Sequence, residues 1–134
     1  MKRFLVIFAL LSGCALVPEE RSWEFVTSVG GIAVEAPQST AKGLILPVRA
    51  DVSGLQAITN PPTTLNSIMS CSATRAKVIG KEILITISTS LLRESGSSRC
   101  PPARLGRLGP GQYTVLYGAK RTNAKPIGVV RVAL

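Results

Sequence analysis

The chain has 134 residues, of which 46% are hydrophobic and only 4% aromatic, and it carries a formal net charge of +9. This length suits one domain, and the largely aliphatic apolar content is enough for a packed core, which argues against a disordered chain. The chain has no histidine. The commonest general base and metal ligand of proteins is therefore excluded.

The first 13 residues have the three parts of a secretory signal peptide. Lys2 and Arg3 are basic, residues 4–11 form an unbroken apolar run, and small residues follow. These eight apolar residues are too few to cross a bilayer as a helix, which takes about 20. We therefore expect residues 1–13 to be removed during export.

The end of this segment resembles a known family. Leu11-Ser12-Gly13-Cys14 is similar to the lipobox of bacterial lipoproteins at all four positions. The resemblance implies a diacylglyceryl group on the Cys14 sulfur, cleavage before Cys14 and acylation of the new amino group. Two or three acyl chains anchor a protein where one would be marginal. In that family an aspartate after the cysteine often means retention at the inner membrane, so Ala15 favours the outer membrane, facing the periplasm. An ordinary signal peptide with an incidental cysteine is the alternative.

Residues 14–22 are expected to form the lipidated N-terminus and a short tether, followed by a single domain over residues 23–134. The eight residues from Ala15 to Ser22 span at most about 25 Å when extended. The domain should therefore stay close to its membrane.

The remaining chain consists of short β-rich segments separated by Gly, Pro, Asn and Ser. In the clearest of them, Ile83, Ile85 and Ile87 alternate with a mostly polar row. In another, Pro47 indicates an edge strand or a bulge. Seven or eight short strands predict an all-β domain, a small sandwich or a barrel. The expected strands are 23–27, 31–36, 44–52, 67–73, 76–79, 83–90, 113–117 and 127–133.

One turn is more specific. The stretch from Leu108 through Pro110 and Gly111 to Tyr113 resembles the corner that leads into a late strand of immunoglobulin-like and fibronectin-like sandwiches. The resemblance implies an immunoglobulin-like β-sandwich in which the Tyr113 ring packs inward and its hydroxyl bonds to backbone a few residues upstream. Such a corner has a structural role only. A plain Pro-Gly turn before a strand is the alternative.

Three cysteines in an exported chain leave one unpaired, and Cys14 has another use. Cys71 and Cys100 are then predicted to form a disulfide in the oxidising periplasm, worth about 3 to 4 kcal/mol in the chain-entropy model. Two cysteines without histidine provide too few ligands for zinc, so no metal and no cofactor are expected. Because Cys100 precedes the Tyr113 corner, an antibody-type core disulfide is not expected.

Charge is distributed unevenly along the chain. Residues 14–70 hold three basic and five acidic residues, whereas residues 71–134 hold eleven basic and two acidic ones, a net charge of +9. The positive electrostatic potential of such a segment favours anionic partners. Arg99, Arg104 and Arg107 lie around Cys100 in a Pro- and Gly-rich stretch and are the candidate anion patch, with ordinary solvated basic residues as the alternative. Nucleic acid is not expected, since an exported basic half with only two tyrosines offers no stacking platform.

No catalytic constellation is found in the sequence. Ser39-Thr40-Ala41-Lys42 has the Ser-x-x-Lys spacing of penicillin-recognising enzymes, but the further motifs of those enzymes are missing. The expected function is therefore non-catalytic. It is that of a lipid-anchored accessory or structural module that binds an unidentified protein of an envelope assembly. The alternative is an anion-binding module that contacts lipopolysaccharide, phospholipid or cell-wall polymer through the basic C-terminal half.

Overall fold

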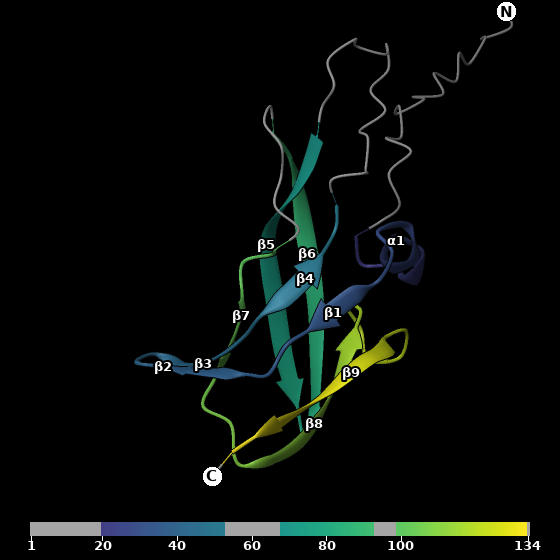
Figure 1. Ribbon diagram of the computed structural model, residues 1–134. Coiled ribbons are helices and arrows are strands. Elements are labelled where there is room, and N and C mark those ends of the chain that lie inside the picture. Colours follow the sequence, from purple (N-terminus) through teal and green to yellow (C-terminus); the bar gives the residue numbers. More distant parts are fainter. Residues whose placement is uncertain (1–19, 53–67, 93–98, 134) are drawn as a thin grey trace, which may run out of the picture.

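The computed structural model describes residues 20–52, 68–92 and 99–133 (Figure 1). These residues form nine strands and one short helix, so the expected all-β fold is confirmed, with one or two strands more than predicted. Leu11 to Cys14, and residues 14–19 of the expected tether, lie outside the described residues. The signal peptide, the lipidation and the start of the domain therefore stay predictions.

The largest sheet has the strand order β5-β6-β8-β9. Strands β6 and β8 run parallel, and the other two pairs are antiparallel. Gly80 and Lys81 make a two-residue turn between β5 and β6, with Gly80 in the left-handed region at φ +58°. The members are β5 (Ile68–Ile79), β6 (Glu82–Leu92), β8 (Gly111–Tyr117) and β9 (Lys125–Val132).

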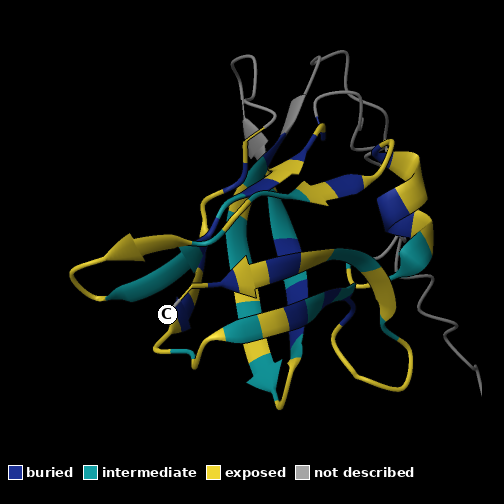
Figure 2. Ribbon diagram, turned by 60° about the horizontal axis from the view of Figure 1, so that its bottom comes forward, coloured by how far each residue is buried: buried dark blue, intermediate teal, exposed yellow. Residues whose placement is uncertain are grey.

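Two smaller sheets form the other layer and cross in front of β5 and β6 in Figure 1. One has the order β2-β3-β7 and the other is the pair β1-β4. Leu46 and Val48 of this layer join Ile83, Ile85 and Val115 of the large sheet in one buried cluster. In Figure 2 the buried positions follow the stretches where the two layers meet. The strands of this layer are β1 (Ile32–Val34), β2 (Gln38–Thr40), β3 (Gly43–Leu46), β4 (Val48–Ala50) and β7 (Ala103–Gly106).

The prediction of a strand over residues 23–27 is wrong, because this segment is helix α1 (Trp23–Ser28). The Ser22 hydroxyl accepts a hydrogen bond from the Phe25 N–H at 3.2 Å and caps the first turn. Phe25, Val26 and Val29 are buried, with the spacing of one helix face. A short apolar run has no periodicity that distinguishes a strand from a helix. The packing of these side chains in the core therefore determines that the segment is helical.

Pro47 divides the expected strand 44–52 into β3 and β4, which belong to different sheets. Proline has no N–H to give to a sheet, and here its carbonyl accepts from the Glu35 N–H at 3.0 Å. The segments expected at 67–73 and 76–79 are one continuous strand, β5. Strands β5 and β6, with 12 and 11 residues, are thus not short as predicted.

A buried tyrosine, the third residue of β8, is bonded to the turn that precedes the strand. Tyr113 is 4% exposed, and its hydroxyl donates to the Gly109 carbonyl four residues upstream at 2.9 Å. The Lys81 ammonium lies 4.5 Å from the ring centroid, which adds a cation–π contact. The phenol therefore joins the 109–113 corner to the β5–β6 turn.

Candidate functional site

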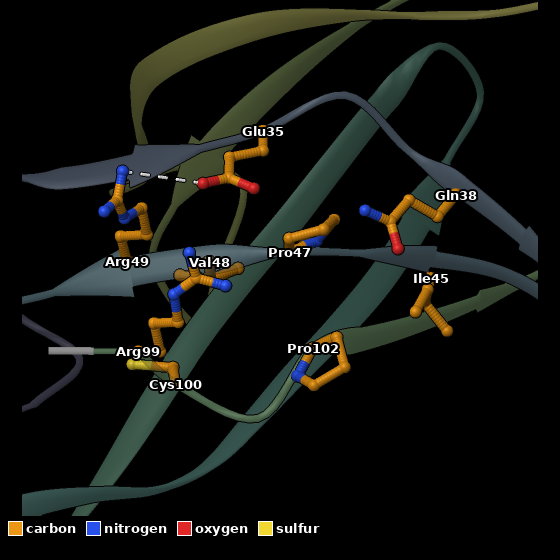
Figure 3. A pocket seen from close by; sticks show the side chains of 9 residues that line it. All are labelled: Glu35, Gln38, Ile45, Pro47, Val48, Arg49, Arg99, Cys100 and Pro102. Carbon is orange, nitrogen blue, oxygen red and sulfur yellow. Dashed lines mark ion pairs between the residues drawn. The ribbon is translucent and has the colours of Figure 1, made fainter. Parts of the chain in front are cut away.

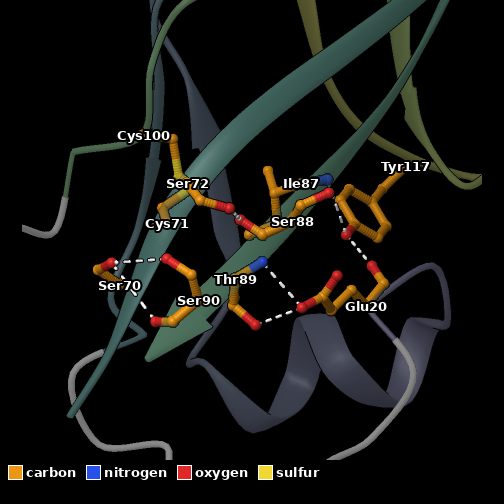
Figure 4. The surroundings of a disulfide bond; sticks show 10 residues. All are labelled: Glu20, Ser70, Cys71, Ser72, Ile87, Ser88, Thr89, Ser90, Cys100 and Tyr117. Atoms are coloured by element: carbon orange, nitrogen blue, oxygen red, sulfur yellow. Dashed lines mark hydrogen bonds between the residues drawn. A yellow bond between two sulfur atoms is a disulfide. The ribbon is translucent and has the colours of Figure 1, made fainter. Parts of the chain in front are cut away.

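A disulfide fixes the backbone beside the first residue of the expected anion patch. Cys71 in β5 is bonded to Cys100, as the sequence predicted, with 5.0 Å between the two Cα atoms (Figure 4). The Cys100 N–H also donates to the Val48 carbonyl at 3.1 Å. Arg99 forms an antiparallel bridge with Arg49 at the same place. Cys100 is therefore held from both layers, and the exposed Arg99 side chain projects from a constrained backbone.

The two bridged arginines line a hollow of about 240 Å³ (Figure 3). Pro47 and Pro102 also line it. The Arg49 guanidinium lies 3.6 Å from the Glu35 carboxylate, and both side chains are substantially exposed. The bridge between Arg49 and Arg99 thus brings two basic residues to one place on the surface, where a positive potential attracts anionic groups.

A second hollow, of about 500 Å³, adjoins the first and lies between the β2–β3 turn and β7. Lys42 lines it from the turn and Arg104 from β7. Ile45 and Pro102 line both hollows, so the two form one continuous surface. We call this surface the cationic face and define it by Lys42, Arg49, Arg99 and Arg104.

The structure therefore brings together two of the three predicted arginines. Arg99 and Arg104 line adjoining hollows, whereas Arg107, which follows β7, is exposed and lines neither. Sequence reasoning missed Lys42 and Arg49, which come from the half of the chain with net negative charge. The available signal for Arg49 was its place in the polar row of the expected strand 44–52.

The Ser-x-x-Lys match lies on the β2–β3 hairpin. Ser39 is an exposed residue of β2, and Lys42 is in the turn that follows. The Thr40 hydroxyl donates to the Gly43 carbonyl across that turn. The serine therefore does not start a helix, as it does in penicillin-recognising enzymes.

A partly buried polar cluster holds the start of the described chain against the large sheet (Figure 4). The Glu20 carboxylate accepts from the Thr89 N–H at 2.8 Å and from the Thr89 hydroxyl. The Tyr117 hydroxyl donates to the Glu20 carbonyl and accepts from the Ile87 N–H at 3.3 Å. Glu20, in the expected tether, is thus docked on β6 and β8.

The same cluster changes the acidity of Tyr117, which is 2% exposed. Burial raises the pKa of Tyr117, the hydrogen bond from the Ile87 N–H lowers it and the Glu20 charge raises it, and the net result is a pKa of about 12. The phenol is therefore neutral at physiological pH. In this neutral form the Tyr117 hydroxyl joins the Glu20 carbonyl to the Ile87 N–H through two hydrogen bonds.

Within residues 20–52, 68–92 and 99–133, no group of three or more Cys, Asp or Glu side chains is placed to hold a metal ion. The same described residues contain no helix long and apolar enough to cross a membrane. No protein-family model, curated protein or solved structure matches this chain.

Proposed function

We propose that this protein is a non-catalytic accessory module of the cell envelope, anchored by lipid on Cys14, which binds an acidic segment of a partner protein through the cationic face. The observation that carries the proposal is the gathering of four basic side chains, Lys42, Arg49, Arg99 and Arg104, around two adjoining hollows. Among the described residues that line them, Glu35 provides the one carboxylate. Complementary charge of this kind steers association and selects partners.

The composition of the hollows supports a protein as the partner. Ile45, Pro47 and Pro102 lie among the cations. Protein interfaces combine an apolar centre with a polar rim in this way. A sugar-phosphate polymer would satisfy the charges and leave the apolar surface uncovered.

The edge of β2 offers a second means of binding. Among the described strands β2 pairs only with β3, and all three of its residues are exposed. The β2–β3 hairpin projects from the body of the domain in Figures 1 and 2. A partner strand could therefore add to this edge while its acidic side chains reach the cationic face.

The test is site-specific photo-crosslinking in cells, followed by mass spectrometry of detergent-extracted material. A photoreactive residue is placed at Gln38 on β2, and the control position is Val129 on β9, which is 57% exposed. We expect one or a few envelope proteins to be captured from Gln38 and not from Val129. Capture should be lost with Arg104→Glu. It should be kept with the control Arg131→Glu, which makes the same change of charge at an exposed residue of β9.

The same extract tests the anchor. Mass spectrometry should find acyl groups on Cys14, and Cys14→Ser should release the protein from the membrane. Capture of no protein from Gln38 would refute the protein-binding proposal, and an unmodified Cys14 would refute the lipid anchor.

The four cations also favour the second candidate function, contact with lipopolysaccharide phosphates or cell-wall polymer. Both candidates depend on exposed charges, so both should weaken with added salt. Recovery of polymer instead of protein would therefore establish this candidate in place of the first.

A further inference from the structure

A second group of basic side chains lies beside the point where the described chain begins. Arg21, Trp23 and Lys120 line a hollow of about 570 Å³ between the start of α1 and the β8–β9 connection. The Lys125 ammonium lies 5.3 Å from the Trp23 ring centroid. We call Arg21, Lys120 and Lys125 the tether-side cluster.

The cluster carries a net positive charge. Its three basic side chains are exposed, and within the described residues none of them forms an ion pair. Glu24, which lines the hollow with Arg21 and Lys120, is the opposing charge, and Lys125 adds a third cation at the Trp23 ring. Arg121 is excluded, because its guanidinium is 2.8 Å from the Glu82 carboxylate and the two charges cancel.

The position of this cluster relative to the expected anchor is set by Glu20. Thr89 and Tyr117 hold Glu20 on the large sheet, and Arg21 is the next residue. Glu20 is only six positions after Cys14, so the connecting chain reaches at most about 20 Å. The tether-side cluster is therefore confined to the neighbourhood of the headgroups in which the Cys14 lipid is embedded.

The cationic face is on another side of the molecule. In Figures 1 and 2, α1 and the projecting β2–β3 hairpin lie at opposite sides of the domain. The side that bears the tether therefore differs from the side proposed to bind a protein. A domain resting on its tether side would leave the cationic face accessible.

We infer that the tether-side cluster, with Trp23, is a membrane-contact surface that binds the anionic phospholipid headgroups of the anchoring membrane. Basic side chains near a negatively charged membrane each strengthen binding, and tryptophan favours the interface. A lipid chain and a basic patch together anchor more firmly than either alone. The inference rests on the lipid anchor of the proposed function, which brings this surface to the membrane.

The test measures binding of the chain from residue 14 to 134, carrying Cys14→Ser and the Cys71–Cys100 disulfide, to phosphatidylcholine vesicles with and without phosphatidylglycerol. Sedimentation gives the partition coefficient. Trp23 is the single tryptophan of the chain, so its fluorescence reports directly on this surface. We expect binding and a blue shift of Trp23 emission only with phosphatidylglycerol, both reversed by salt.

Two triple variants of equal net charge separate this surface from general basicity. Arg21→Ser/Lys120→Ser/Lys125→Ser should lower the partition coefficient about a hundredfold, at about fivefold for each basic side chain. The control, Lys42→Ser/Arg49→Ser/Arg104→Ser, should keep both the binding and the blue shift.

If the triple variant does not fold, the double variant Arg21→Ser/Lys120→Ser retains the Lys125–Trp23 contact and should still lose about 25-fold. Equal losses in the tether-side and control variants would overturn the inference, since binding would then follow total charge. Absence of binding to phosphatidylglycerol would overturn it as well. This assay needs neither an acyl group nor a protein partner, so its failure leaves the proposed function standing, and loss of the crosslinked partner leaves the vesicle result standing.

Discussion

Removal of the disulfide should cost a large part of the stability of the domain. Cys71 and Cys100 are 29 positions apart, and opening a loop of this length costs about 3.5 kcal/mol in the chain-entropy model. Cys100 is also 7% exposed and belongs to the buried cluster, so truncation to alanine adds about 1 kcal/mol of lost packing. We expect Cys71→Ala/Cys100→Ala to lower the free energy of unfolding by about 4 kcal/mol, where domains of this kind have about 5 to 15.

The assay is equilibrium unfolding in urea, followed by Trp23 fluorescence and circular dichroism, with Cys14→Ser in every protein compared. The slope of free energy against urea should rise in the double variant, because an unfolded chain without the crosslink exposes more surface. Chemically reduced protein with both cysteines in place is the control and should lose about 3.5 kcal/mol without the packing contribution. A loss below about 1 kcal/mol with an unchanged slope would refute the reasoning, since the bridge would then not restrict the unfolded chain.

Three further predictions concern stability and are measured by the same urea titrations. Tyr117→Phe should cost about 1 to 3 kcal/mol at neutral pH, because it removes a buried hydroxyl with two hydrogen-bond partners. The pKa of Tyr117 rises from 10.0 unfolded to about 12 folded, so its contribution is complete below pH 10 and is lost as the pH approaches 12. The difference between the two proteins should thus shrink by about 1.4 kcal/mol per pH unit in that window, and a constant difference would contradict the shift. Tyr113→Phe should cost about 1 kcal/mol through loss of the bond to the Gly109 carbonyl, and no loss would show that this bond does not stabilise the corner. Gly43→Ala should cost about 2 kcal/mol or more, because Gly43 has φ +117° and an added Cβ would lie 2.8 Å from the Gly106 carbonyl oxygen. Its control is Gly80→Ala, where an added Cβ meets nothing within 4 Å and only the left-handed backbone is strained.

Local features that depend on a short stretch of sequence were predicted well. The alternation of Ile83, Ile85 and Ile87 with polar residues identified β6, and these three side chains are buried. Pro47 indicated an edge strand or a bulge within one expected strand, and in the structure it lies between two strands of different sheets. These features follow from the two-residue period of a strand and from the missing N–H of proline, which need no information about distant residues.

Two features that depend on partners distant in the chain were not predicted. Residues 23–28 became a helix because Phe25 and Val26 pack into the core, which a six-residue apolar pattern cannot indicate. The Glu20 carboxylate binds Thr89, which is 69 positions away, and no sequence pattern near Glu20 predicts this contact.

The sequence by itself therefore determined the all-β class, the Cys71–Cys100 disulfide and the excess of basic residues after Cys71. Only the tertiary structure decided which basic side chains share a surface. Arg49 lies opposite Arg99 in a β-bridge, and the β2–β3 turn places Lys42 at the hollow that Arg104 also lines. The physical reason is that charge and periodicity are properties of neighbouring residues, whereas a binding surface is made by strand register and packing, which join segments far apart in the chain.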